Sequence, residues 1–166
     1  PRSPAPPGRA GRAGRGADRR FMAVLDADGP AGVASFLRGA PAAGSLEIGH
    51  ICLSPRLQRT AGATEALSMM MAWAFGAGYR RVEWKCDARN AASRRAAGRL
   101  GLFFEGIFRQ ATVVKDRNRD TAWYAAIDAD WPEIAAAHAL WLDPDNFDKD
   151  GGQRLSLADL TRPILD

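Results

Sequence analysis

A run of small residues from Gln58 to Ala66, with the sequence QRTAGATEA, indicates chemistry more directly than any other part of this chain. It follows an apolar segment from Ile48 to Leu53 and opens a helix-like pattern. A strand, a tight turn of small side chains and a helix leave several backbone N–H groups at the helix start without partners. These groups and the helix dipole favour a phosphate or a pyrophosphate. The segment therefore predicts a site for a phosphate-bearing cofactor, with close packing of small residues as the alternative.

Two common phosphate-binding motifs do not fit this segment. No Gly-Lys-Ser/Thr sequence closes it, which excludes a Walker loop, and Gly62 is its single glycine where a dinucleotide fingerprint needs three. The residues of this segment alone leave the identity of the cofactor open.

The elements that must position this site follow from periodicity and end signals. Strand 81–87 is the clearest, because Val82, Trp84 and Cys86 alternate with polar residues. Thr60 and Asn90 are the predicted N-caps of two helices. The predicted strands are 21–26, 33–38, 45–53, 81–87, 103–114 and 121–127, and the predicted helices run from 60 to about 77, from 90 to 100 and from 131 to about 142. This order predicts a mixed α/β sheet whose two strand–helix units each place a helix N-terminus at the end of a strand.

Alternation within segment 45–53 assigns its residues to two faces. Ile48, His50 and Cys52 fall on one face, and Glu47, Gly49 and Ile51 on the other. His50 is therefore expected on a buried face, as a core histidine rather than a base. Cys52 and Cys86 are expected to be buried, reduced thiols without a disulfide or metal-ligand spacing. His138, in the last helix, is expected to be structural.

The net charge of +4 belongs to the start of the chain. The first 20 residues carry six arginines and one acid, a net of +5, so the other 146 residues carry about −1. Four prolines and four glycines in the same 20 residues predict a disordered leader. An RNA-associated protein that binds through this tail is an alternative, although nucleic acid is not the expected partner of the near-neutral body. No apolar run suits a membrane span and no secretory pattern opens the chain, so the default expectation is cytoplasmic.

Three blocks of residues, in order, carry a family resemblance over about Phe21 to Pro132. They are Leu46 to Ile51 with Leu53-Ser54-Pro55, then Gln58 to Ala66, then Asn90-x-x-Ser93 with Arg99 to Leu102 and Glu105-Gly106. The second block is similar to a Gln/Arg-x-x-Gly-x-Gly/Ala pyrophosphate loop. Together the blocks resemble the GCN5-related N-acetyltransferase (GNAT) superfamily, in particular its ribosomal-protein-alanine-acetyltransferase-like (RimJ/RimL-type) branch.

The resemblance implies a mixed, mostly antiparallel sheet with flanking helices, in which strands 45–53 and 81–87 splay apart. Acetyl-CoA, the implied cosubstrate, would enter this wedge, where the free strand edges satisfy its pantetheine amides. The implied acceptor is a primary amine, either on a protein N-terminus or on a small molecule. A homodimer is compatible with the resemblance. The implied cofactor-binding residues are Leu53 for the thioester oxygen, Gln58, Arg59, Thr60, Ala61, Gly62 and Ala63 for the pyrophosphate, Asn90 for the pantetheine arm, Ser93 for the CoA sulfur, and Arg99 for the adenosine phosphate.

The implied chemistry is direct attack of an unprotonated amine on the thioester, in a ternary complex and without a metal. Glu47 is the first candidate for the general base, with a solvated strand carboxylate as the alternative. Asp87 is the second candidate, or else a turn residue. Ser93 either offers its hydroxyl to the leaving sulfur or completes a helix cap.

The sequence departs from the family pattern in two places. Ala61 replaces the first loop glycine, which requires a helical backbone there. The strand and two helices that open the family fold, and form part of its acceptor site, are expected to be missing, so a non-catalytic acyl-CoA-binding or regulatory module is a further alternative. The expected organisation is a leader over 1–20, an acetyltransferase domain over 21–142 and an extension over 143–166.

Two further motifs have ordinary explanations. Asn146 to Gly151 is similar to half of a calcium loop, but Leu157 stands where a bidentate glutamate is required, which argues against calcium. The turn from Arg117 to Arg119 either faces an acidic acceptor or is a solvated hairpin tip.

Overall fold

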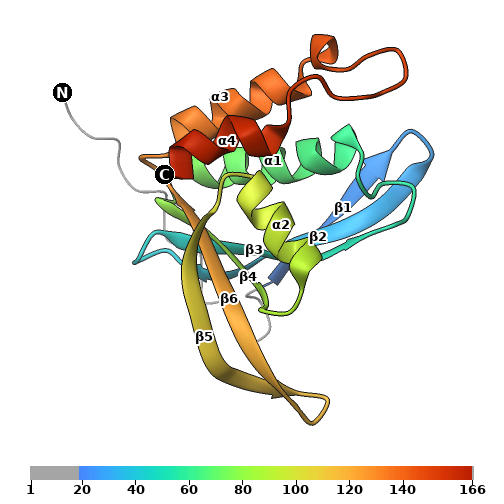
Figure 1. Ribbon diagram of the computed structural model, residues 1–166. Coiled ribbons are helices and arrows are strands. Elements are labelled where there is room, and N and C mark those ends of the chain that lie inside the picture. Colours follow the sequence, from blue (N-terminus) through green and yellow to red (C-terminus); the bar gives the residue numbers. More distant parts are fainter. Residues whose placement is uncertain (1–18, 166) are drawn as a thin grey trace, which may run out of the picture.

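A single mixed sheet carries the fold of residues 19–165, which are the residues that the computed structural model describes (Figure 1). Its strand order is β1-β2-β3-β4-β6-β5, and only β3 and β4 run parallel among the neighbouring pairs. The strands are β1 (Arg19–Asp26), β2 (Gly29–Ala40), β3 (Ser45–Leu53), β4 (Arg81–Asp87), β5 (Phe103–Val114) and β6 (Arg117–Ile127). The helices are α1 (Ala61–Gly76), α2 (Ala91–Arg99), α3 (Trp131–Leu142) and α4 (Leu157–Leu165), with a short 3-10 helix at Pro144–Asn146.

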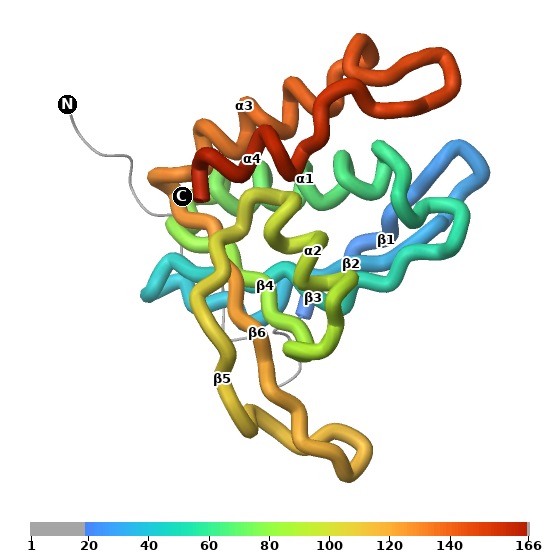
Figure 2. The backbone as a smooth tube through the Cα atoms, viewed as in Figure 1, coloured from blue at the N-terminus to red at the C-terminus, as the bar shows by residue number. Residues whose placement is uncertain are grey.

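The helices gather on one side of the sheet (Figures 1 and 2). Helices α1 and α2 follow β3 and β4 and lie against the sheet, and α3 and α4 pack on them. The core between the layers is built from apolar side chains of the four helices and of strands β2, β3, β4 and β6. Its members include Ile48, Met71, Val82, Trp84, Leu100, Ile134 and Leu157. Burial of this apolar area is the main force that holds the helices on this face. The opposite face of the sheet carries both polar side chains, such as Glu47 and Lys85, and apolar ones, such as Phe108 and Trp123.

Local sequence explains where the first two helices begin. The Thr60 hydroxyl accepts a hydrogen bond from the Ala63 N–H at 3.2 Å, and the Asn90 carboxamide oxygen accepts one from the Ser93 N–H at 3.0 Å. Both predicted N-caps are confirmed. Ala61 is the first residue of α1, so the helical backbone that an alanine requires there is present.

The predicted splay of the central strands is confirmed. Strands β3 and β4 pair only at Ser45 with Arg81, Leu46 with Val82, and Glu47 with Glu83. Beyond these pairs β3 continues to Leu53 and β4 to Asp87. The outer neighbours stay paired, β2 with β3 as far as Leu53 and β6 with β4 along its whole length. The sheet is therefore split between two strands that are each held from the other side.

A bulge in β3 overturns the predicted burial of His50 and Cys52. Ser35 of β2 pairs with Gly49 and Val33 with Cys52, so two residues of β3 stand opposite one residue of β2. His50 takes a left-handed φ of 49° at this point. One extra residue reverses the alternation of a strand, so both predicted positions are exposed instead of buried. Ile51 packs against the core in their place, and Cys86 is buried as predicted.

The C-terminal half differs from the prediction in two elements. The β5–β6 turn comprises only Lys115 and Asp116, both with positive φ, so β6 begins at Arg117 and its Arg119 is a strand residue rather than part of a turn. Helix α4 was not predicted, yet its Leu157 is fully buried in the core. It closes the side of α2 and α3 that the predicted elements leave open.

Residues 1–18, the first part of the predicted leader, lie outside the described residues. They include most of the arginine-rich tail for which RNA binding is the alternative. The last two residues of that leader, Arg19 and Arg20, begin β1. None of the helices between residues 19 and 165 is long and apolar enough to cross a membrane.

Candidate active site

Three backbone N–H groups at the start of α1 are open to a ligand. The turn before the helix uses its first amides internally, because the N–H groups of Leu57 and Gln58 both donate to the Ser54 carbonyl at 3.0 Å. Within the described part of the chain, the N–H groups of Arg59, Ala61 and Gly62 make no hydrogen bond, and all three residues are exposed. Unpaired amides at the start of a 16-residue helix form an anion site.

The loop that presents these amides is anchored from below. Leu57 is 4% exposed and packs in a small apolar cluster with Val24, Ala31 and Ala63. The Gln58 side chain donates to the Leu53 carbonyl at 2.8 Å, which ties the loop to the end of β3. Gln58 thus positions the loop.

Gly62 is not required by the fold. A Cβ at this position would lie 3.7 Å from Leu57 Cδ1 and 3.8 Å from Thr60 Oγ1, which are ordinary contacts, and its φ is not positive. Packing within the described chain therefore does not explain the missing side chain.

Three predicted residues lie around the start of α2, and each has a local role. Asn90 caps the helix, and Asp87 Oδ1 accepts from the Arg89 N–H at 2.8 Å. The Ser93 hydroxyl accepts a hydrogen bond from the buried Trp84 indole N–H at 2.9 Å. A hydroxyl that accepts one bond keeps its own proton to donate. Ser93 is thereby oriented by the core and still available to a ligand.

Arg99 joins α2 to two other helices. Its Nη1 donates to the Thr64 hydroxyl of α1 at 2.9 Å, and its guanidinium lies 4.6 Å from the centre of the Trp141 ring of α3. Burial lowers the pKa of this guanidinium. Thr64 belongs to the first turn of α1, so Arg99 brings a positive charge near the open amides.

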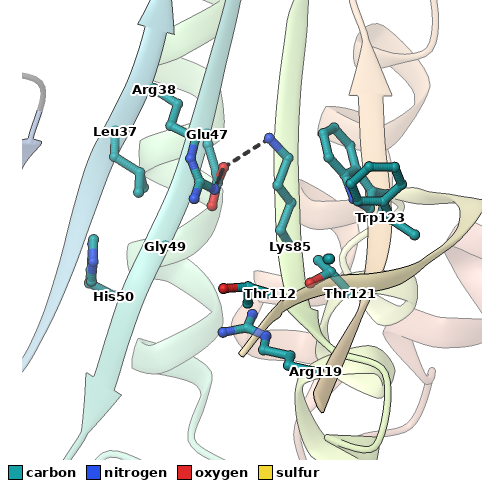
Figure 3. Close-up of a pocket in the computed structure, with 12 residues that line it drawn as sticks. Leu37, Arg38, Glu47, Gly49, His50, Lys85, Thr112, Arg119, Thr121 and Trp123 are labelled. Carbon is teal, nitrogen blue, oxygen red and sulfur yellow. Dashed lines mark hydrogen bonds and ion pairs between the residues drawn. The ribbon is translucent and has the colours of Figure 1, made fainter. Parts of the chain in front are cut away.

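The other face of the sheet holds an open cavity of about 680 Å³ across the split (Figure 3). Residues of five strands line it: Leu37, Arg38, Glu47, Gly49, His50, Lys85, Phe108, Ala111, Thr112, Arg119, Thr121 and Trp123. Glu47 of β3 and Lys85 of β4 alternate with core residues, which places them on the face away from the helices. The phosphate loop and this cavity thus lie on opposite sides of one opening.

Glu47 is a buried, paired carboxylate, so the alternative of a solvated strand residue is wrong. It is 4% exposed, and its Oε2 lies 2.7 Å from Arg38 Nη1 and 3.1 Å from Lys85 Nζ. Lys85 Nζ also contacts Glu83 Oε2 at 2.7 Å and lies 3.9 Å from the centre of the Trp123 ring. Figure 3 shows Glu47 between its two cations. Sequence reasoning missed Arg38 and Lys85, because only strand register brings them to Glu47.

His50 is a second titratable group in this cavity. Its Nδ1 lies 2.8 Å from the Ser35 hydroxyl, which is also 3.1 Å from the Gly49 carbonyl oxygen. When the single Ser35 proton is donated to Gly49, His50 Nδ1 is the donor to Ser35 and Nε2 carries the free lone pair. The bulge thus turns a predicted core histidine into a candidate proton acceptor.

No metal-binding group is found in the described chain. Within residues 19–165, no three His, Cys, Asp or Glu side chains are placed to hold a metal ion.

Comparison with known proteins agrees with this geometry. The family described as the acetyltransferase (GNAT) domain matches residues 9–102, more than half of the chain. A GCN5-related N-acetyltransferase from Brucella melitensis is 46% identical, with a TM-score of 0.85 over 89% of this chain and 68% of that one. A probable GNAT-family acetyltransferase from Chromobacterium violaceum ATCC 12472 is also 46% identical, with a TM-score of 0.69 over 71% and 61% of the two chains. The chain belongs to the GNAT acetyltransferases, a family of acyltransferase enzymes.

A more distant acetyltransferase shares the fold of this chain. The microcin C7 self-immunity acetyltransferase MccE, solved in complex with acetyl-CoA and AMP, is 23% identical with a TM-score of 0.61 and shares the fold alone. The curated proteins contain no match. This chain spans 68% and 61% of the length of the two relatives named first.

Proposed function

We propose that this protein is an N-acetyltransferase of the RimJ/RimL-type branch, which transfers the acetyl group of acetyl-CoA to a primary amine on a small molecule or a protein N-terminus. The observation that carries the proposal is the split in the sheet, where β3 and β4 part after Glu47 and Glu83 while their outer edges stay paired. One side of the split holds open amides at a helix start, and the other holds the cavity. Two substrates can therefore meet in the opening from opposite faces.

The cofactor side supplies groups for each part of acetyl-CoA. The N–H groups of Arg59, Ala61 and Gly62 suit the pyrophosphate, and the unpaired edges of β3 and β4 suit the pantetheine amides. Ser54 adds a residue that sequence reasoning did not assign, since its hydroxyl is buried without a partner among the described residues. We assign Asn90 to the pantetheine arm and Arg99 to the adenosine phosphate, as the family resemblance implies.

The reaction needs one nucleophilic attack and two proton transfers. The amine nitrogen attacks the thioester carbon, the C–N bond forms, and the C–S bond breaks to release CoA. Glu47 takes the proton that the ammonium group must lose, directly or through water, because it lines the cavity at the point where the strands part. The second proton that the nitrogen loses after attack reaches the departing sulfur through Ser93, which gives its own proton to the sulfur and takes up the proton from the nitrogen, directly or through water. An N–H near Leu53 polarises the thioester carbonyl.

Calorimetric titration with CoA and acetyl-CoA tests the cofactor site, and thiol release with a panel of primary amines tests transfer. Binding of both cofactors together with turnover supports the proposal. Binding without turnover supports the non-catalytic module instead, and no binding contradicts both.

Replacing Gly62 with valine locates the pyrophosphate. We expect Gly62→Val to weaken CoA binding more than about tenfold, because the branched side chain adds bulk beside the open amides. The matched control is Gly76→Val, at the other end of α1, where a Cβ meets nothing within 4 Å. Equal affinity in the two variants contradicts the assigned loop.

A further inference from the structure

One lysine crosses the sheet at the point where it splits. Strands β3 and β4 make their last pair at Glu47 and Glu83, and Lys85 is the next residue of β4 on the same face. Its Nζ lies 3.1 Å from Glu47 Oε2 and 2.7 Å from Glu83 Oε2. Figure 3 shows this side chain reaching from β4 to Glu47. Lys85 therefore joins the two strands just beyond the last pair that their backbones make.

The last pair of β3 and β4 brings two negative charges together. The carboxylates of Glu47 and Glu83 contact the same ammonium group, so they lie on the same face of the sheet, and like charges on paired residues destabilise the pairing. Both side chains are largely buried, so water screens their repulsion only weakly. Burial raises the pKa of Glu83, but Lys85 and Arg81 together lower it by more. A cation between the two carboxylates thus offsets a repulsion that would otherwise push the strands apart.

Strand β6 holds Lys85 from its other side. Lys85 pairs with Trp123 in the register of β4 and β6, and its Nζ lies 3.9 Å from the centre of the Trp123 ring. Behind it, the Arg81 guanidinium contacts both Glu83 and Glu105. The ammonium group is therefore fixed by one aromatic ring and two carboxylates.

The second cation beside Glu47 does not cross the split. Arg38 belongs to β2, which is already paired with β3 as far as Leu53. Its side chain is 58% exposed, against 9% for Lys85. Exposed ion pairs contribute little to stability, whereas removal of one partner from a buried pair is costly. Of the two cations, Lys85 alone ties the Glu47 carboxylate to β4.

We propose that Lys85 is a positioning residue, which fixes the point where β3 and β4 part and holds the Glu47 carboxylate at the base of the opening. Its effect on the sheet does not depend on the reaction, whereas its effect on Glu47 rests on the proposed acetyl transfer. In that reaction Lys85 acts through Glu47, which takes the proton from the amine. A carboxylate held in one place meets the amine in one geometry, which is the condition for efficient proton transfer.

Backbone hydrogen exchange measures this link without any substrate. Lys85→Met keeps an unbranched side chain but removes its charge, and exchange at the last β3–β4 pair should become more than about tenfold faster, because two like charges then face each other. Exchange in the β4–β6 pairs should stay unchanged. The matched control, Arg38→Met, removes the other cation beside Glu47 and should leave exchange at the last pair unchanged. No acceleration in Lys85→Met, or the same acceleration over the whole sheet or in both variants, overturns the proposal.

A second substitution identifies repulsion as the cause. Glu83→Gln removes one of the two like charges, so the double variant Lys85→Met with Glu83→Gln should recover most of the protection lost in Lys85→Met. If Lys85→Met does not fold, the double variant should fold. A double variant that is as unprotected, or as unfolded, as Lys85→Met overturns the proposal.

Steady-state kinetics test the effect on Glu47. Lys85→Met should lower kcat more than about tenfold and change KM for acetyl-CoA less than about threefold, because the carboxylate loses its orientation while the cofactor loop keeps its contacts. Lys85→Arg keeps the positive charge and should recover most of kcat. An unchanged kcat in Lys85→Met overturns the positioning of Glu47, even where turnover supports the proposed function. If exchange responds as expected but the wild-type protein acetylates no amine, Lys85 keeps its role in the sheet and the proposed function fails.

Discussion

Glu47 is the residue in which burial, charge and position coincide most closely. It touches two cations, it is almost fully buried, and it belongs to the last residue pair before the strands part. A glutamine keeps the shape and one oxygen acceptor but cannot take a proton. Glu47→Gln should therefore lower kcat/KM about 10²- to 10⁴-fold with little change in acetyl-CoA affinity. The measurement is steady-state kinetics together with cofactor calorimetry.

The pH–rate profile separates a base from a merely structural carboxylate. With Glu47 as the base, the fall in rate on the acidic side of this profile disappears in Glu47→Gln. His50→Gln is the decisive comparison, because His50 lines the same cavity. Loss of this fall in rate in that variant alone assigns the proton transfer to His50. Asp87→Asn serves as the control, since Asp87 already holds the Arg89 amide, and it should cost less than about tenfold.

Residues whose roles depend on near neighbours could be predicted, and residues that depend on strand register could not. The side chains of Thr60 and Asn90 accept hydrogen bonds from N–H groups only three residues further along the chain. Their residue types are therefore enough to predict both helix caps. Arg38 and Lys85 meet Glu47 only because β2, β3 and β4 pair in one particular register. The side-chain period of a strand gives the face of a residue but not its partner on the next strand.

At the scale of elements, the bulge in β3 decides which thiol reacts. Cys52 follows the bulge and is exposed, whereas Cys86 of β4 is 6% exposed in the core. One of the two thiols should therefore react rapidly with Ellman's reagent in the native protein, and the second only after unfolding. Cys52→Ser should remove the fast phase, and Cys86→Ser should leave it. Two slow thiols, or a fast phase that survives in Cys52→Ser, contradict the reversed alternation.

The bulge and the splay differ in how far sequence could anticipate them. The splay was implied by a family resemblance and is present in the pairing of β3 with β4. The bulge turns on a non-glycine residue, His50, at a φ of 49°. No residue type in segment 45–53 predicts that conformation at His50, because bulky residues seldom adopt a positive φ. Simple alternation therefore failed at the residue that faces the cavity.

At the scale of the whole molecule, one buried histidine joins three helices. His138 of α3 is 1% exposed, its Nε2 lies 3.1 Å from the Leu100 carbonyl at the end of α2, and its Nδ1 lies 2.9 Å from the Ser68 hydroxyl of α1. A carbonyl only accepts, so Nε2 carries the proton and Nδ1 accepts from Ser68. This structural role is the predicted one. Helix α4 completes the same layer through Leu157, and it escaped prediction although it buries a core residue.

His138 should make the stability of the fold depend on pH. Burial, against a smaller opposing effect of the Leu100 carbonyl and with a further contribution from Arg99, lowers the pKa of this imidazole below its ordinary 6.5. The unfolded chain therefore binds a proton that the folded chain excludes as pH falls through about 6.5. The free energy of unfolding should then decrease toward acidic pH, by at most about 1.4 kcal/mol per pH unit from this group.

Urea unfolding between pH 7.5 and 5 measures this slope. His138→Gln should flatten it, whereas His50→Gln removes the other histidine of the chain from an exposed position and should leave it intact. Three carboxylates are expected to titrate below this range, because their pKa values are lowered from ordinary values already below pH 5. Arg56 lowers the pKa of Asp26, and the Gln110 amide lowers that of Asp120. For Glu83, burial raises the pKa, but Lys85 and Arg81 together lower it by more. If the free energy of unfolding of His138→Gln still decreases toward acidic pH with the same slope, protonation of another group destabilises the fold. His138, the histidine that joins α1, α2 and α3, would then not be the cause.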